Sequence, residues 1–327
     1  MDPVTHGFVG ATSAQLFSDK KSFRAASFVG CIAALAPDLD VFLGSISDPL
    51  LQLELHRHFT HSIVFIPFGS LLVSGILWWV VRKKLTFKQT YFFSLAGYAT
   101  AGFMDVITSY GVHLLWPFLD ERFSINIISV FDPLFTVILL GISVFALIKK
   151  RKSLTLAAVA WVIFYLSIGF VQKSRVTELA HSKIETDQEI IVKPTLGNQI
   201  LWSVRYVEDN QLCGMGIRAG FFSEPKIYDG TCAPLVDLQQ EYSNFAGTVL
   251  YDDIRRFSEL SDGLLVRHPE YPNVLGDGRY SMLPTTLSPL WGITADTTIA
   301  DQHVRFDSYR DASEEVRNAF LDMILGN

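Results

Sequence analysis

The sequence predicts an α-helical, multi-pass membrane domain of about six apolar helices, some of them re-entrant, followed by a soluble α+β domain. Three observations support this fold class. Apolar segments recur through the first 174 residues, and basic loops separate them. Beyond about Gln172 the chain becomes polar and acidic, with strand-like and helix-like patterns. We therefore expect a membrane-embedded domain at 1–174 and a soluble domain at 175–327.

Six apolar segments are candidates for membrane helices: residues 3–17, 25–37, 62–81, 89–110, 129–148 and 153–171. The third and the last are uncharged for 20 and 19 residues, and a helix needs about 20 apolar residues to cross the hydrocarbon layer. The fourth and the fifth contain one acidic residue each, Asp105 and Asp132. The first two are shorter and rich in Gly and Ala, so thin spans, re-entrant helices and helices buried against the others all stay open.

The basic residues predict which ends of these segments face the cytoplasm. Of the 14 Lys and Arg in residues 1–174, 11 lie in three loops, at 20–24, 82–88 and 149–152. Cytoplasmic loops of membrane proteins are enriched in Lys and Arg, so we expect these loops inside. Six spans then place both termini and the soluble domain outside the cytoplasm. The expected location is the cytoplasmic (inner) membrane.

The second half has the composition of a soluble domain. Residues 175–327 contain 13 basic and 23 acidic residues, and this excess of negative charge disfavours a nucleic-acid partner. Two strands are expected at 200–207 and 212–218 around a polar turn, a third at 189–193, and a helix at about 244–259.

Three cysteines constrain the redox chemistry only loosely. Cys31 lies in an apolar segment, whereas Cys213 and Cys232 lie 19 residues apart in the second half. A disulfide between these two is compatible with a domain outside the cytoplasm. Two unpaired cysteines, packed as small apolar side chains, are equally compatible with the sequence.

Histidines gather at the ends of the apolar segments opposite to the basic loops. His56, His58 and His61 lie directly before an uncharged segment, and imidazole is the commonest metal ligand near neutral pH. His6 and His113 lie at the same ends, and each is either a ligand or the partner of a simple hydrogen bond. A single interfacial histidine is more often an anchor at the lipid head groups. The grouping is what favours a metal site.

Three aspartates could complete such a site. Asp38 follows a proline, and one residue separates it from Asp40. One of the two carboxylates could therefore bind a metal while the other orients a histidine. Asp105 is an acid inside an otherwise apolar helix. Because a charge is costly there, Asp105 is a functional candidate. The structural alternative for Asp105 is an ion pair with Arg57.

Several motifs occur in the order typical of a known family. These are Met1-Asp2-Pro3-Val4-Thr5-His6-Gly7, Ala36-Pro37-Asp38-Leu39-Asp40, His56-Arg57 followed by Thr60-His61-Ser62, and Met104-Asp105-Val106 through to Trp116-Pro117-Phe118. With them, the membrane half resembles the YdjM-like family of membrane-bound, metal-dependent hydrolases. Arg279-Tyr280-Ser281 and Pro289-Leu290-Trp291-Gly292-Ile293 are similar to the extra C-terminal domain of the longer members.

The resemblance implies a multi-pass inner-membrane protein with a metal centre and hydrolase activity. It matches the polar cluster of the family to His6, Asp38, Asp40, His56, His61 and Asp105. Many members have a histidine four residues before the aspartate that corresponds to Asp105, and this chain has Ala101 there. His113 then substitutes, or the site holds fewer metal ions, or the activity has changed.

The expected function is hydrolysis of an ester or phosphoester at the outer face of the membrane, with a divalent metal, preferably zinc. Asp38 orients a ligand or acts as general base, and Arg57 faces the developing negative charge. The expected metal ligands are His6, Asp40, His56, His61 and Asp105, with His113 as the substitute.

The expected surroundings are membrane lipids, and a lipid-linked small molecule suits the site because it can arrive laterally. Two other classes of function stay open. A non-catalytic membrane scaffold or assembly protein would use the same histidines structurally, and its purified form would hold no metal. A transporter would need its ionisable groups near the bilayer midplane.

Overall fold

The computed structural model describes residues 1–184 and 189–327 and forms two compact units. The first unit comprises Met1–Leu43, Leu55–Val171 and Leu196–Asn198, and the second comprises Gly44–Glu54, Gln172–Thr195 and Gln199–Asn327. The short segment Gly44–Glu54 thus packs with the second unit. This differs from the predicted membrane-embedded domain at 1–174, which includes the segment.

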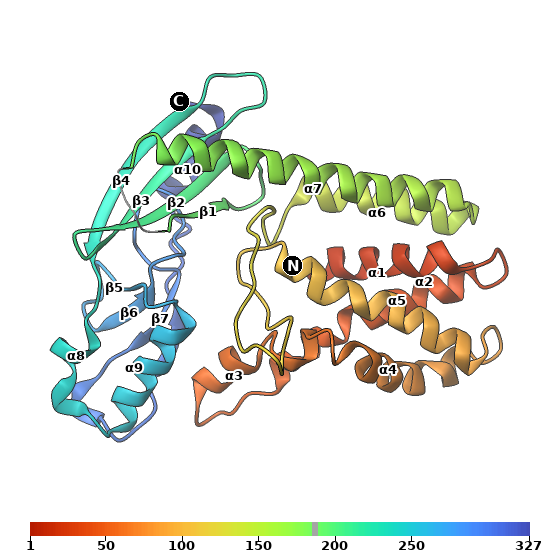
Figure 1. Cartoon of the computed structure of the whole chain (residues 1–327), viewed down its shortest axis with the longest axis horizontal. Helices are drawn as coiled ribbons and strands as arrows, with labels where there is room; N and C mark the ends of the chain where they lie inside the picture. The colour runs from red at the N-terminus through yellow and green to blue at the C-terminus, as the bar shows by residue number, and fades with distance from the viewer. Residues whose placement is uncertain (185–188) are drawn as a thin grey trace. The chain divides into compact units, whose positions relative to one another are not determined.

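The first unit consists of helices (Figure 1). They are α1 (Pro3–Phe17), α2 (Phe23–Leu35), η1 (Pro37–Phe42), η2 (Phe59–His61), α4 (Ile66–Val81), α5 (Phe87–Val106), α6 (Pro133–Lys149) and α7 (Lys152–His181), the last of which continues into the second unit. Helices α1, α2 and α5 meet at glycines. An added Cβ would lie 2.4 Å from the Gly30 carbonyl oxygen at Gly10 and 2.3 Å from it at Gly97. Only glycine permits so close a backbone approach.

Fewer helices can cross a membrane than the sequence predicted. In the described parts of the chain two helices are long and apolar enough, Phe23–Phe42 and α7. A third is obtained if Pro49–His61 and Ile66–Val81, which are bent by 90° to each other, count as one broken span. The prediction of about six spans is therefore wrong.

The lengths of three helices explain most of the difference, whereas α5 has 20 residues and is still not among the candidate spans. Helices α1, α4 and α6 contain 15, 16 and 17 residues, so at about 1.5 Å per residue they are shorter than the hydrocarbon layer. The uncharged run 62–81 begins with a bend and turns, and its helix starts only at Ile66. Helix α6 begins after Asp132, which accepts a hydrogen bond from the Phe135 amide at 3.1 Å.

The second unit contains two antiparallel, four-stranded sheets. The first sheet has the order β1 (Ile191–Pro194), β2 (Leu201–Glu208), β3 (Gln211–Arg218) and β4 (Lys226–Pro234), and the second has β5 (Leu265–Arg267), β6 (Val274–Asp277), β7 (Trp291–Thr294) and β8 (Arg305–Ser308). The predicted hairpin is confirmed as β2 and β3. Asp209 and Asn210 form its turn with φ of 48° and 61°, the left-handed values that a two-residue hairpin turn of type I′ requires.

Short helices complete the second unit: α3 (Pro49–Leu55), α8 (Leu238–Glu241), η3 (Ser243–Phe245), α9 (Val249–Leu260), η4 (Thr297–Ile299) and α10 (Glu314–Leu325). Leu50 of α3 is fully buried in the same apolar core as Ile254 and Phe257 of α9. The Arg256 guanidinium donates hydrogen bonds to Glu54 at 2.7 Å and to Asp48 at 3.0 Å. Apolar and ionic contacts together therefore hold α3 on α9.

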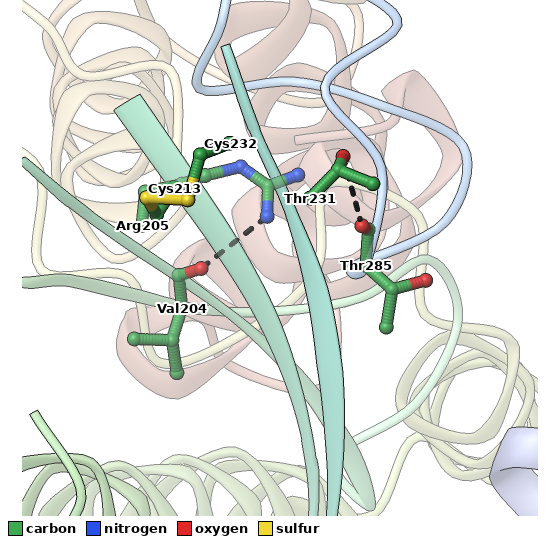
Figure 2. Close-up of a disulfide and its surroundings, with 6 residues drawn as sticks. All are labelled: Val204, Arg205, Cys213, Thr231, Cys232 and Thr285. Carbon is green, nitrogen blue, oxygen red and sulfur yellow. Dashed lines mark hydrogen bonds between the residues drawn. A yellow bond between two sulfur atoms is a disulfide. The ribbon is translucent and has the colours of Figure 1, made fainter. Parts of the chain in front are cut away.

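A disulfide joins β3 to β4. Cys213 and Cys232 are direct partners in the antiparallel register, with Cα atoms 4.1 Å apart, and their sulfur atoms are bonded. Figure 2 shows the side chain of Arg205 beside this bridge. Of the two states that the sequence left open for these cysteines, the structure has the bonded one.

Candidate metal centre

Separate segments of the first unit supply the side chains of the candidate centre. Helix α1 contributes His6, the turn η1 after α2 contributes Asp38 and Asp40, and the end of α5 contributes Asp105. The segment 56–61, which precedes α4, contributes the histidines of the HRHFTH motif. The start of α1 and the end of α5 lie side by side (Figure 1), and the amino group of Met1 contacts Asp105.

Local sequence explains why these side chains point into the bundle. Asp2 caps α1 by accepting a hydrogen bond from the Thr5 amide at 3.0 Å, so His6 follows within the first turn. Pro37 ends α2 and starts the 3-10 turn that holds the two aspartates. Gly102 of α5 lies against the backbone of His61, since an added Cβ there would be 2.4 Å from the His61 carbonyl oxygen.

Four side chains form what we call the central cluster: His6, Asp38, His61 and Asp105. His6 Nε2 lies 3.2 Å from Asp105 Oδ1 and 4.0 Å from Asp38 Oδ2. His61 Nε2 lies 3.2 Å from Asp105 Oδ2 and 3.4 Å from Asp38 Oδ1. The first, third and fourth side chains are fully buried, whereas that of Asp38 is 23% exposed. Two imidazoles and two carboxylates thus converge, with Asp38 at the solvent-exposed edge.

The central cluster contains ligand atoms that form ion-pair contacts but no hydrogen bond within the described chain. Asp38 Oδ1, His61 Nε2 and Asp105 Oδ2 are buried and have no hydrogen-bond partner among residues 1–184 and 189–327. His61 Nε2 contacts the two carboxylate oxygens only at the ion-pair distances of 3.2 and 3.4 Å. His6, Asp38 and Asp105 each offer one ligand atom, and these three atoms lie within 4.8 Å of one another. Imidazole nitrogens and carboxylate oxygens are the ligands of zinc and similar divalent ions. The residues present therefore fit a metal ion.

Asp40 makes a different set of contacts. Its Oδ1 lies 2.7 Å from His56 Nδ1, and its Oδ2 accepts hydrogen bonds from the Arg57 amide at 2.9 Å and the Thr60 hydroxyl at 2.6 Å. The same Oδ2 lies 3.4 Å from His61 Nδ1. Both oxygens are thus engaged by the HRHFTH segment. Of the two aspartates, Asp38 is the one that contacts both His6 and His61 Nε2, whereas Asp40 was the one expected among the metal ligands.

Thr60 fixes the proton on the His61 ring. Its hydroxyl gives its single hydrogen to Asp40, so its oxygen can only accept from His61 Nδ1, which lies 3.0 Å away. A proton on Nδ1 leaves the lone pair of a neutral imidazole on Nε2. That atom points to Asp38 and Asp105, where a metal would bind.

Arg57 is the buried cation beside the central cluster. Its backbone φ of 60° is in the left-handed region, which turns the chain sharply between His56 and His58. Its side chain is 6% exposed, and Nη2 lies 3.2 Å from Asp105 Oδ1. Nε and Nη1 have no hydrogen-bond partner in the described chain. Arg57 therefore pairs with Asp105 and still has donors available for an anion.

The remaining two predicted ligands lie outside the central cluster. His56 contacts Asp40 and is partly exposed. His113 lies in a second group with His58 and Asp120, and its Nδ1 is 3.0 Å from Asp120 Oδ1. Burial, with the nearby charges of Arg122 and His58, lowers the pKa of His113 to about 4. His113 thus belongs to this second group.

Asp120 and His58 are not among the predicted metal ligands. Asp120 lies in the loop that follows α5, and only the path of that loop brings it to His58, at 3.3 Å between Oδ1 and Nε2. No spacing rule would have joined residues so far apart. At the position of the usual family histidine, Ala101 is buried one turn before Asp105. In this chain the imidazoles that contact Asp105 are those of His6 and His61.

The comparisons with known proteins agree with the motifs. The model of the YdjM inner membrane protein family matches residues 1–176, which is more than half of the chain. A curated relative is the uncharacterized protein YfhP of Bacillus subtilis (strain 168), 24% identical over 205 residues. The match covers 60% of this chain and 62% of that relative, less than two thirds of its length. No solved structure matches the chain.

Proposed function

We propose that the chain, a member of the YdjM inner membrane protein family with converging imidazole and carboxylate groups in its first unit, is a divalent-metal-dependent hydrolase of the inner membrane. One observation supports this most strongly. His6, Asp38 and Asp105 each offer one ligand atom, and these atoms lie within 4.8 Å of one another, with His61 Nε2 in contact with both carboxylates. Converging imidazole and carboxylate groups are the ligand set of zinc and similar divalent ions.

The proposed ion is zinc, held by the central cluster of His6, Asp38, His61 and Asp105. A mixed set of imidazole and carboxylate ligands is typical of catalytic zinc sites. A bound divalent ion supplies a water of pKa about 7, and hence hydroxide at neutral pH. Asp40 is the orienting group, because it holds His56 directly and His61 through Thr60.

Two residues act on the substrate in this proposal. Asp38 is the exposed member of the central cluster, so one of its carboxylate oxygens would bind the ion while the other could accept a proton from the attacking water. Arg57 has unpartnered Nε and Nη1 donors in a buried setting, where an anion gains more from a cation than it would in water. A phosphoester or ester that develops negative charge suits such a site.

The proposed substrate is an amphiphilic, lipid-linked ester or phosphoester. Helix α7 is long and apolar enough to cross the bilayer, and Lys149 to Lys152 form a basic group at its start. A disulfide in the second unit favours an oxidising compartment for that unit, which supports the outer face of the membrane. The acidic second half disfavours a nucleic-acid substrate.

The test is turnover of lipid-like phosphoesters and of oligonucleotides by the detergent-purified chain, with and without a chelator. We expect chelator-sensitive turnover of the lipid-like compounds. Asp38→Asn should abolish it, and Arg57→Lys should lower kcat by about 10²- to 10³-fold, as the loss of one charge-stabilising group typically does.

Other outcomes would redirect the proposal. Faster turnover of oligonucleotides would indicate a nuclease. A protein that holds no metal and turns over neither class of compound would indicate a membrane scaffold.

A further inference from the structure

A second group of possible metal ligands lies outside the central cluster. His58 precedes η2, whereas His113 and Asp120 come from the loop between α5 and α6. His58 Nε2 lies 3.3 Å from Asp120 Oδ1, and His113 Nδ1 lies 3.0 Å from the same oxygen. One donor atom from each residue fits within 4.8 Å of the others. The loop and the HRHFTH segment therefore meet at two imidazoles and one carboxylate.

Aromatic rings pack against the two histidines of this group, whereas its aspartate is exposed to solvent. The His58 and His113 rings lie 4.4 Å apart between centroids, and Trp116 lies 5.6 Å from His58. Asp120 is 76% exposed, so a cation could reach it from solvent. His58 Nδ1 is buried and has no hydrogen bond to any described residue.

We propose that His58, His113 and Asp120 bind a divalent cation of their own, separate from the ion of the central cluster. Two histidines and one carboxylate leave coordination positions for water, as in many sites for zinc and related ions. The proposal goes beyond the proposed hydrolase, because none of these three residues belongs to the central cluster.

The position of the second site suggests what it does. The His113 amide donates a hydrogen bond to the Arg57 carbonyl at 3.1 Å, and His58 is the next residue after Arg57. A cation held by His58 and His113 would therefore clamp the loop to the backbone that places Arg57. In this role the second ion orders the entrance segment and does not itself react.

The experiment is a count of bound cations on the full chain. The detergent-purified protein is stripped with a chelator, dialysed against Zn²⁺ or Co²⁺ at increasing concentration, and analysed for metal per chain. We expect about two ions in the wild type and about one in Asp120→Asn and in His113→Gln. Asp120→Glu should restore the second ion. His181→Gln is the control, because it removes another histidine in the same chain.

The outcomes separate this site from the proposed function. Wild-type stoichiometry in both Asp120→Asn and His113→Gln would overturn the second site, and His58 and His113 would then pair with Asp120 as ordinary ionic partners. Loss of all metal in either variant would also overturn it, since the residues would then serve a single centre. Loss of one ion in Asp120→Asn, with none lost in Asp38→Asn, would support the second site and contradict the central metal centre. Because Asp120 is largely exposed, its substitution should leave the fold intact.

Discussion

His61 is held between two aspartates that bind opposite edges of its ring. Asp40 Oδ2 lies 3.4 Å from Nδ1, and Asp38 Oδ1 lies 3.4 Å from Nε2. The first contact fixes the tautomer together with Thr60, whereas the second is not a hydrogen bond and leaves Nε2 available. Asp40, at Nδ1 of His61, and Asp38, at Nε2, thus have different roles, although both come from the 3-10 turn η1.

We expect Asp38→Asn and Asp40→Asn to weaken metal binding by different amounts. Loss of an orienting partner such as Asp40 typically lowers metal affinity about 10- to 100-fold, and loss of a direct ligand should lower it further. Titration of the chelator-stripped chain with Zn²⁺ measures both affinities. Equal affinities for Zn²⁺ in the two variants, or a larger loss of affinity in Asp40→Asn, would indicate that Asp40 is a direct metal ligand.

Lys193 has a buried amine without a hydrogen-bond partner among the described residues. Its Nζ lies 3.3 Å from the centre of the Tyr280 ring. Burial, together with the charges of Arg205 and Arg279, lowers its pKa well below the usual value. In the unfolded chain this pKa is about 10.4, so the unfolded state binds more protons and stability rises with pH between the two pKa values.

Lys193→Met should therefore stabilise the chain most near neutral pH. The variant has no amine to deprotonate on folding, so its melting temperature should exceed that of the wild type at pH 7, and the gap should narrow toward pH 10. Thermal unfolding at several pH values measures the gap. A gap that does not change with pH would mean that Lys193 keeps an ordinary pKa in the folded chain.

At the scale of elements, α3 is the segment that the sequence assigned least well. It lies in the chain between Asp40 and His56, yet it packs in the core of the second unit. Its contacts come from Arg256, some 200 residues later, and no local pattern records such a pairing. The hairpin β2–β3 was predictable because its alternating residues and its Asp-Asn turn are local signals.

Arg256→Met should loosen α3 selectively. Arg256 donates to Asp48, Glu54 and Asp253 and is mostly buried. Its loss leaves Asp48 and Glu54 without their guanidinium, whereas Asp253 keeps its contact with His303. We expect amide hydrogen exchange in α3 to speed up by about tenfold or more, which corresponds to about 1.4 kcal/mol. Arg255→Met is the matched control, since Arg255 forms only exposed pairs on the same helix. Equal exchange in the two variants would mean that apolar contacts alone hold α3.

At the scale of the molecule, the number of spans was not predictable from uncharged runs. The run 62–81 has the composition of a complete span, but four of its residues form a bend and turns before α4. The convergence of His6, Asp38, His61 and Asp105 was predictable in outline, because all of them lie at the same ends of apolar segments. The sequence does not specify the paths of the loops. These paths decide whether Asp38 or Asp40 contacts the other side chains of the cluster, and they decide the position of His113.

We expect residues 175–327 outside the cytoplasm and Lys84 inside. The basic groups at 82–88 and 149–152 favour the cytoplasm, and the Cys213–Cys232 disulfide favours an oxidising compartment. Single cysteines at positions 84 and 240, in a chain with Cys31→Ser, can be labelled from outside intact cells. Labelling at 240 alone is expected, and labelling at 84 with none at 240 would reverse the topology.

Metal analysis of two variants tests the central claim most directly. Asp120→Asn protein isolates the central cluster, and His61→Gln is then added to remove the imidazole between Asp38 and Asp105. We predict about one divalent ion per chain in Asp120→Asn and almost none in the double variant, with both chains folded by circular dichroism. A full ion retained without His61, or no ion bound in Asp120→Asn after saturation with Zn²⁺, would contradict a metal centre at this site.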